Sequence, residues 1–207
     1  MSIEKAYDDW SGQYDTNRNR TRDLDKELTK SVLGGLRFKE VLELGCGTGK
    51  NTEWLLQRTE KILAVDFSEN MLKIARKKIN DSKVSFKRAD ITKDWDWTVE
   101  NFDLITCNLI LEHIADLDFI FQQAYSKLAN DGHFYVSELH PFKQYKGTKA
   151  RFESKDGRIE LETFTHHISD FTSAAFKAGF ELEKLNEGFD EDQQHTPRLI
   201  SFLFYKK

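Results

Sequence analysis

Residues 41–49 read Val-Leu-Glu-Leu-Gly-Cys-Gly-Thr-Gly, a short apolar run that ends in glycines at alternate positions. Glycine has no Cβ, so this backbone can turn sharply and pass close to a ligand. A strand that enters such a turn before a helix is typical of folds that bind nucleotides at their strand tips. The dinucleotide spacing Gly-x-Gly-x-x-Gly is not met, because the third glycine is Gly49 and position 50 is lysine. The glycine run alone therefore leaves the ligand open.

Apolar runs and helical patterns alternate on both sides of this turn. Strands are expected at 39–44, 61–66, 83–89, 102–107 and 133–139. Helices are expected between them, from the glycines to about 58, after an N-cap at Ser68, and at 115–129. Strands joined by helices need crossover connections, which give a mostly parallel sheet covered on both faces.

The end of the chain changes rhythm. A helix at 169–178 is followed by possible strands at 180–186 and 199–205. The loop between these two strands has no room for a crossover helix, so they would pair as an antiparallel hairpin.

Length and composition indicate one globular domain over residues 1–207. Residues 1–37 would form an N-terminal helical cap across the edge of the sheet, and 141–167 would form an insert or lid. No apolar run approaches the roughly 18 residues of a membrane span, and the acidic N-terminus is unlike a secretory signal, which predicts a cytoplasmic protein without membrane contact. The net charge of −4 argues against nucleic acid as a partner. Oligomers are possible.

Acidic residues follow two of the predicted strands. Asp66 closes the strand at 61–66, where it could accept hydrogen bonds from both ribose hydroxyls of a nucleoside. Asp90 follows the next strand, and with Ile91 it could hold the amino group and ring face of an adenine. For Asp66 alone, the alternative is an acid that stabilises the start of the next helix.

Together these motifs resemble the class I S-adenosylmethionine-dependent methyltransferases, most closely the small-molecule branch that includes quinone-biosynthesis enzymes. The matching stretches are ELGCGTG (43–49), AVDFSENMLKIAR (64–76), RADI (88–91), FDLITCNLILEHI (102–114), LANDGHFYVSELHP (128–141) and AGFEL (178–182). The resemblance implies an α/β fold, a three-layer Rossmann-like sandwich. Its seven-stranded, mostly parallel sheet would have the order 3-2-1-4-5-7-6, with strand 7 antiparallel. The implied cofactor is S-adenosylmethionine.

The resemblance also implies cofactor contacts along the chain. The methionine and ribose part would lie on Gly45, Cys46 and Gly47, with the ribose held by Asp66. The adenine would lie between Phe67, Met71, Asp90 and Ile91, with Asn108 and Leu109 closing over the cofactor. From the N-terminal segment, Tyr14 and Arg22 are candidates to touch the methionine end, where Arg22 would bind the carboxylate. A surface ion pair with Asp23 or Asp25 is the alternative for Arg22.

Methyl transfer from a sulfonium needs positioning and exclusion of water, and it needs a base only when the nucleophile arrives protonated. His140 follows the strand at 133–139, and His167 ends the insert. These two are the predicted catalytic residues, and His166 and His113 are further candidates. The alternative for each is a capping or packing role. The rings of the adjacent pair His166 and His167 would point apart, so no metal site is expected.

Two missing motifs bear on the acceptor. The Asn/Asp-Pro-Pro-Tyr motif of enzymes that methylate exocyclic amines is absent, because residues 107–110 read Cys-Asn-Leu-Ile. No Pro-Cys pair exists for a cysteine-nucleophile route to pyrimidines. Both absences favour a small-molecule methyl acceptor. A tRNA or protein methyltransferase, or a cofactor-binding module without turnover, are the alternatives.

Overall fold

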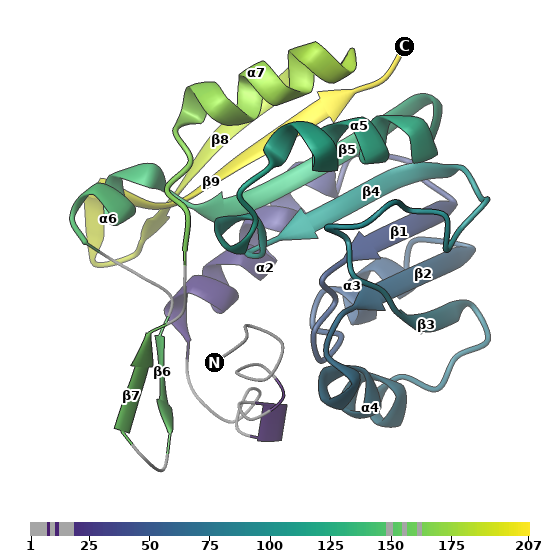
Figure 1. The fold of residues 1–207 in the computed structure, drawn as a ribbon, viewed down its shortest axis with the longest axis horizontal. Helices are drawn as coiled ribbons and strands as arrows, with labels where there is room; N and C mark the ends of the chain where they lie inside the picture. The colour runs from purple at the N-terminus through teal and green to yellow at the C-terminus, as the bar shows by residue number, and fades with distance from the viewer. Residues whose placement is uncertain (1–7, 9–10, 13–18, 148–150, 155–156, 161–162) are drawn as a thin grey trace.

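The computed structural model describes residues 8, 11–12, 19–147, 151–154, 157–160 and 163–207. A seven-stranded sheet has the order β3-β2-β1-β4-β5-β9-β8 (Figure 1). Its strands are β1 (Glu40–Leu44), β2 (Lys61–Asp66), β3 (Val84–Arg88), β4 (Phe102–Asn108), β5 (Leu128–Leu139), β8 (Glu181–Asp190) and β9 (Gln193–Tyr205). The first five are parallel, and β9 runs antiparallel to both β5 and β8. The predicted strand order and the antiparallel strand 7 are confirmed.

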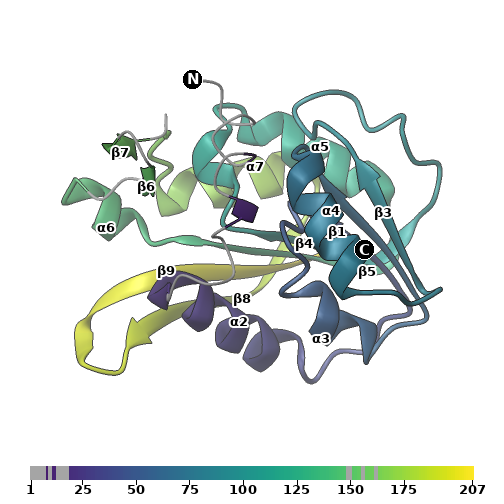
Figure 2. The same ribbon diagram turned by 90° about the horizontal axis from the view of Figure 1, so that it is seen from below.

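Helices cover both faces of this sheet. They are α2 (Arg20–Leu33), α3 (Thr52–Leu56), α4 (Glu69–Lys78), α5 (Leu117–Lys127), α6 (Pro141–Tyr145) and α7 (Ile168–Ala178), with a short 3-10 helix η1 (Leu111–His113). In Figure 2, α2 and α3 lie on one side of the sheet and α5 and α7 on the other. The N-cap at Ser68 is confirmed, since its side chain accepts a hydrogen bond from the Met71 amide at 3.1 Å.

Successive side chains along each strand point to opposite faces of the sheet, so a separate hydrophobic core lies on each face. In β1, Val41 packs with α2 and α3, whereas Leu42 and Leu44 point to the side of α5 and α7. This alternation follows from the two-residue period of a strand. Because both cores are apolar, the central strands read as nearly continuous hydrophobic runs. On the α5 side, Phe121 contacts Phe134 and Phe204 edge to face.

The C-terminal hairpin is longer than the sequence indicated. The predicted loop between 186 and 199 is mostly strand, because β8 continues to Asp190 and β9 begins at Gln193. Arg198 Nη2 lies 2.6 Å from Asp190 Oδ2, and this ion pair joins the two extended arms. A polar extension of a hairpin lacks the apolar alternation from which strands are recognised, so its length was underestimated.

The N-terminal helix and the insert also differ in detail from expectation. Helix α2 packs on the face formed by β5, β9 and β8 rather than across the sheet's edge. The insert begins with α6 and contains a two-stranded antiparallel hairpin, β6 (Arg151–Ser154) with β7 (Gly157–Glu160). In the described part of the chain, no helix combines the length and apolar character that a membrane crossing requires.

Candidate functional site

The glycine turn between β1 and α3 adopts backbone angles that favour glycine. Gly45, Gly47 and Gly49 have φ values of +65°, +54° and +84°. At Gly45 a Cβ atom would also lie 2.6 Å from Ile110 Cγ2. The amide of Cys46 donates to the Val65 carbonyl at 3.0 Å, which ties the turn to β2. Glycine at 45 is therefore required both by the turn and by the close approach of the β4 tip.

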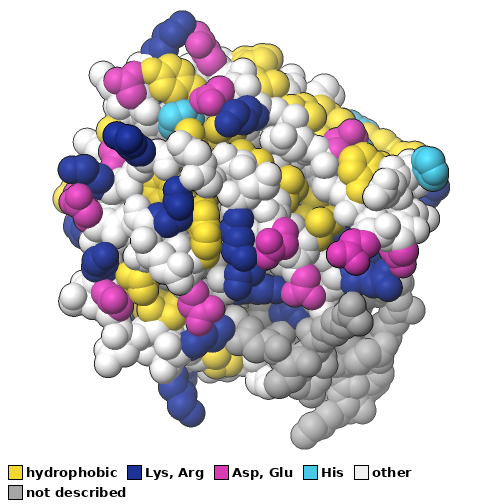
Figure 3. All heavy atoms as spheres, turned by 180° about the vertical axis from the view of Figure 1, so that it is seen from behind, with side chains coloured by type: hydrophobic (Ala, Val, Ile, Leu, Met, Phe, Trp, Pro, Cys, Tyr) yellow, Lys and Arg dark blue, Asp and Glu magenta, His cyan; other side chains and the backbone are white. Residues whose placement is uncertain are grey.

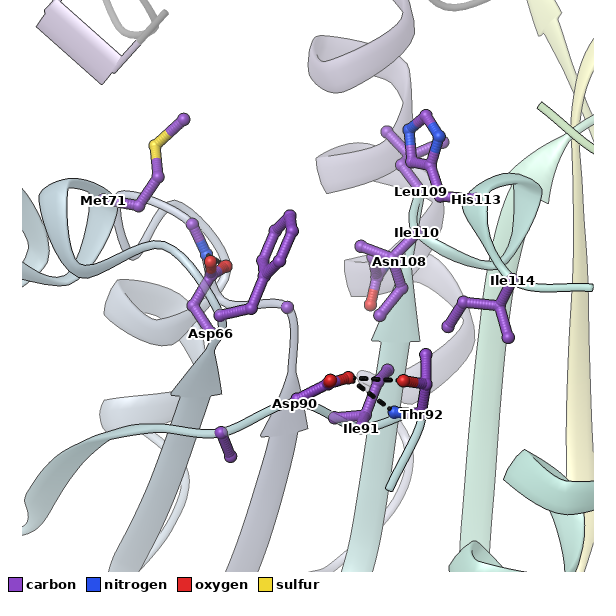
Figure 4. A pocket seen from close by; sticks show the side chains of 14 residues that line it. Asp66, Met71, Asp90, Ile91, Thr92, Asn108, Leu109, Ile110, His113 and Ile114 are labelled. Carbon is purple, nitrogen blue, oxygen red and sulfur yellow. Dashed lines mark hydrogen bonds between the residues drawn. The ribbon is translucent and has the colours of Figure 1, made fainter. Parts of the chain in front are cut away.

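A pocket opens beside this turn at the carboxyl ends of the strands (Figure 4). Its volume is about 160 Å³, and its mouth is open to solvent. It is lined by Gly45, Gly47, Asp66, Phe67, Met71, Ala89, Asp90, Ile91, Thr92, Asn108, Leu109, Ile110, His113 and Ile114. Residues of four neighbouring strand tips thus face one space.

Asp66 joins the glycine turn to the start of α4. Its Oδ2 accepts a hydrogen bond from the Gly47 amide at 2.8 Å, and its Oδ1 accepts one from the Ser68 amide at 2.9 Å. Burial of the side chain raises the pKa of Asp66 to about 6, although these amides oppose the shift. Each carboxylate oxygen can accept a further hydrogen bond from a ligand. The turn and the carboxylate lie side by side, as the sequence predicted.

The tip of β3 carries the second acid. Asp90 Oδ1 accepts hydrogen bonds from the amide and the hydroxyl of Thr92 at 3.0 and 2.6 Å, drawn as dashed lines in Figure 4. The next residue, Ile91, is half-buried, and its carbonyl accepts a hydrogen bond from Trp95 Nε1 at 2.9 Å. These contacts fix the direction of the loop that forms this side of the pocket.

The opposite wall follows β4. Leu109 has a φ of +57°, which is strained for a residue with a branched side chain, and its amide donates to the Ser137 carbonyl at 2.8 Å. The amides of Ile110 and Leu111 both donate to Glu138 Oε1, at 2.9 and 2.7 Å. Burial raises the pKa of Glu138 well above its usual range. A buried carboxyl on β5 therefore holds the wall at 110–111 in place.

Of the four candidate histidines, His113 lines the pocket. His140 caps α6, since its Nδ1 accepts a hydrogen bond from the Phe142 amide at 3.1 Å. Burial lowers the pKa of His140, while Glu187, with Oε1 3.1 Å from Nε2, opposes the shift. His140 is outside the pocket lining. A catalytic role for His140 stays a prediction.

The two histidines at the end of the insert support neighbouring segments. His166 Nε2 lies 2.7 Å from the carbonyl of Ile114, a residue of the pocket wall. The backbone amide of His167 donates to Asp170 Oδ2 at 2.8 Å at the start of α7, and its Nδ1 lies 2.6 Å from the hydroxyl of Tyr145. Neither lines the pocket, and catalysis by His167 also stays a prediction. In the described part of the chain, no three His, Cys, Asp or Glu side chains gather as a metal site.

Two expected cofactor contacts, Cys46 and Arg22, lie outside this lining. The side chain of Cys46 is buried in the core under the turn. Arg22 lies half-buried on α2, and Tyr14 falls outside the described residues. Thr92, Ile110 and Ile114 line the pocket but were not predicted as site residues, and Glu138 was not predicted as a buried support. Asp25, expected only as a possible surface partner of Arg22, is buried. For Asp25 a signal existed, because residues 25, 29 and 32 form one helical stripe on which a carboxylate is unusual.

Known proteins resemble this chain in sequence and in fold. The family model of a methyltransferase domain matches residues 41–132. The malonyl-[acyl-carrier protein] O-methyltransferase of Bacillus cytotoxicus is 31% identical, covering 86% of this chain and 75% of that protein. The ubiquinone biosynthesis O-methyltransferase of Idiomarina loihiensis is 32% identical over 51% of this chain and 44% of its own length. An S-adenosylmethionine-dependent methyltransferase from Mesorhizobium loti shares the fold, with a TM-score of 0.72, 20% identity and coverage of 88% of this chain and 98% of that one.

These similarities fall on the pocket. The matched stretch 41–132 contains every residue named above as lining it. The Bacillus cytotoxicus protein extends the similarity over most of both chains, and the sheet order is the one expected for this fold. With a sequence, a sheet and a strand-tip pocket that agree, the chain belongs to the S-adenosylmethionine-dependent methyltransferases.

Proposed function

We propose that this methyltransferase acts on a small-molecule acceptor by direct in-line methyl transfer. One observation carries the proposal. A single pocket has the acids Asp66 and Asp90 on one side and the mostly apolar wall of Leu109, Ile110 and Ile114 on the other. The polar side suits an adenosine and the apolar wall suits an organic acceptor, so donor and acceptor would meet between them.

The residues present fit S-adenosylmethionine. The buried carboxylate of Asp66 would accept the ribose hydroxyls, beside a turn whose positive φ values let backbone approach the ligand. Asp90 and Ile91 would hold the adenine, which Phe67 and Met71 would flank. When bound, S-adenosylmethionine supplies a methyl group on a positively charged sulfur. Asn108 and Leu109 would close over the methionine end, with Arg22 as the candidate partner of its carboxylate.

The acceptor side would position the nucleophile and exclude water. His113 lies on this wall (Figure 4) and could take a proton from an acceptor that arrives as a hydroxyl or ammonium. His140, which precedes the insert 141–167, and His167, which ends it, remain the predicted catalytic residues, and we propose that the insert covers the acceptor. Variants of the three histidines separate these roles, since a base alters the pH dependence of kcat and a cap alters stability.

Two further observations support a small acceptor. On the face shown in Figure 3, positive and negative side chains are interspersed, whereas nucleic-acid phosphates are usually met by a basic face. The relatives are named for malonyl-[acyl-carrier protein] and ubiquinone biosynthesis. A cytoplasmic location of the protein would fit such substrates.

The first experiment is a thermal-shift panel of S-adenosylmethionine, S-adenosylhomocysteine, NAD and ATP. Stabilisation by the first two is expected, and stabilisation by NAD alone would overturn the assignment of the pocket. Asp66→Ala should weaken binding by about 1–3 kcal/mol, the usual loss when a buried hydrogen-bond set is unmatched. An unchanged affinity would show that Asp66 only stabilises the start of α4.

The acceptor class is tested with S-adenosylmethionine labelled in the methyl group. Cell extract is separated into small-molecule, RNA and protein fractions, and each is incubated with the enzyme. Label transferred to the small-molecule fraction supports the proposal. Label in RNA alone, or in protein alone and not released when thioester-linked acyl groups are cleaved, contradicts it.

A further inference from the structure

A carboxylate on α2 lies directly behind the pocket. Asp25 is buried, with 4% of its surface exposed, and it receives two side-chain amides. Asn108 Nδ2 donates to its Oδ1 at 2.9 Å, and Asn51 Nδ2 donates to its Oδ2 at 3.2 Å. Asn108 ends β4, and Asn51 precedes α3 after the glycine turn. Asp25 therefore links the two strand-end segments that flank the methionine end of the site.

The direction of these hydrogen bonds fixes how Asn108 is turned. Burial raises the pKa of Asp25, and the amides of Asn108 and Asn51 oppose that shift by donating to its carboxylate. In the ionised form the carboxylate can only accept, so the Asn108 nitrogen faces Asp25. The same nitrogen donates to Thr29 Oγ1 at 2.9 Å, and the Thr29 hydroxyl in turn donates a hydrogen bond to the Tyr135 hydroxyl at 3.4 Å. Both acceptors lie on α2, so both hold the amide nitrogen on the side away from the pocket.

The amide oxygen of Asn108 is left for the pocket. Asn108 lines the pocket, and in Figure 4 its oxygen is seen from the pocket side. A carbonyl oxygen backed by a buried carboxylate is a good acceptor for a cation, because the carboxylate polarises the amide and adds negative potential. The methionine end of the cofactor carries an ammonium group, which has donors and no acceptor.

We propose that Asp25 is a positioning residue that holds the Asn108 oxygen toward the ammonium group of the bound cofactor. This inference rests on the proposed placement of the cofactor, with its adenosine at Asp66 and its amino-acid part between Gly45 and Asn108. It assigns to α2 a part in recognising the amino-acid end, beyond covering the sheet. The adenosine end is left to Asp66 and Asp90.

The test compares two ligands by isothermal titration. S-adenosylhomocysteine has the amino-acid part, and 5′-methylthioadenosine lacks it. Asp25→Ala removes both acceptor oxygens, whereas Asp25→Asn retains one and removes the charge. Glu27→Gln is the matched control, because Glu27 lies on the same helix with its side chain 68% exposed and paired with Lys30.

We expect Asp25→Ala to weaken S-adenosylhomocysteine binding roughly 10- to 100-fold, the range for a lost hydrogen bond to a charged group. Asp25→Asn should lose less, and methylthioadenosine binding should stay within about twofold in both variants. The control should bind both ligands as the wild type does. Asp25→Asn nearly preserves shape, so it remains informative if the alanine variant unfolds.

Two results would overturn the proposal. Equal losses for both ligands would show that Asp25 only supports the fold of the site, and unchanged S-adenosylhomocysteine binding in Asp25→Ala would show that it plays no part. Wild-type protein that binds neither ligand would instead disprove the cofactor placement, which distinguishes that failure from failure of the Asp25 role.

Discussion

Replacement of Gly45 by alanine tests the geometry on which the pocket depends. Two costs add at this position. The φ of +65° costs an L residue about 1–2 kcal/mol. The new Cβ would also lie 2.6 Å from Ile110 Cγ2 and 2.9 Å from Cδ1, and such overpacking costs about 1–3 kcal/mol.

Gly147 provides a matched control with one of the two costs. Its φ is +83°, and a Cβ there meets nothing within 4 Å. Alanine also restricts the unfolded chain, which offsets about 0.4–1 kcal/mol at both positions and cancels in the comparison. The free energy of unfolding should therefore fall by about 1–3 kcal/mol more in Gly45→Ala than in Gly147→Ala.

Urea unfolding of both variants gives this difference directly. In an Ile110→Ala background the extra cost of Gly45→Ala should largely disappear, because both clashing atoms are gone. Gly45→Ala should also weaken S-adenosylhomocysteine binding at least about tenfold, because glycine permits close backbone approach there. Equal losses of stability at 45 and 147, with binding intact, would refute the proposed close contact between the turn and the β4 tip.

Three further outcomes depend on titratable groups. The pKa of Asp66 is about 6, so its carboxylate is protonated below that pH. The binding of S-adenosylhomocysteine should therefore weaken as pH falls from 7 to 5, whereas binding to Asp66→Asn should not change with pH. Wild-type binding that does not change with pH would contradict this. Burial raises the pKa of Glu43 to about 8, so the folded state retains a proton that the unfolded state releases above about pH 4.5, and stability falls as pH rises through that window. Measured by urea unfolding, the free energy of unfolding of Glu43→Gln should therefore rise relative to that of the wild type by up to about 1.4 kcal/mol per pH unit between pH 5 and 8. If the two proteins lose stability with pH in parallel, ionisation of Glu43 is not the cause. His140→Ala should lower the unfolding free energy by about 1 kcal/mol through loss of the α6 cap; a fall in kcat at unchanged stability would instead support its predicted catalytic role.

Much of the sheet could be predicted because its signals are local. The strand at 61–66 is found at those positions, and Ser68 caps the next helix, because each depends on residues close in sequence. The acids at 66 and 90 reach one pocket because parallel strands end at one edge. The length of the β8–β9 hairpin was missed, because its tip is polar and gains its order from pairing between distant residues.

The supports of the pocket could not be found in the same way. Asp25 meets Asn108 across 83 positions of sequence, and Glu138 meets Ile110 across 28. Such contacts exist only once the chain has folded, so the helical spacing that marks Asp25 as unusual does not reveal its partner Asn108. The position of a residue in the sequence can also suggest more than the structure shows. His140 lies at a strand end typical of catalytic residues, but its side chain accepts a hydrogen bond from the Phe142 amide and caps α6.

The backbone of Leu109 has a consequence for how this protein balances stability against activity. A leucine with a φ of +57° carries about 1–3 kcal/mol of conformational strain that a glycine would relieve. That amount is a sizeable share of the free energy of unfolding of a typical domain, which is about 5–15 kcal/mol. The chain thus carries this strain in the wall of the pocket, at the proposed border between donor and acceptor, where glycine would be the more stable residue.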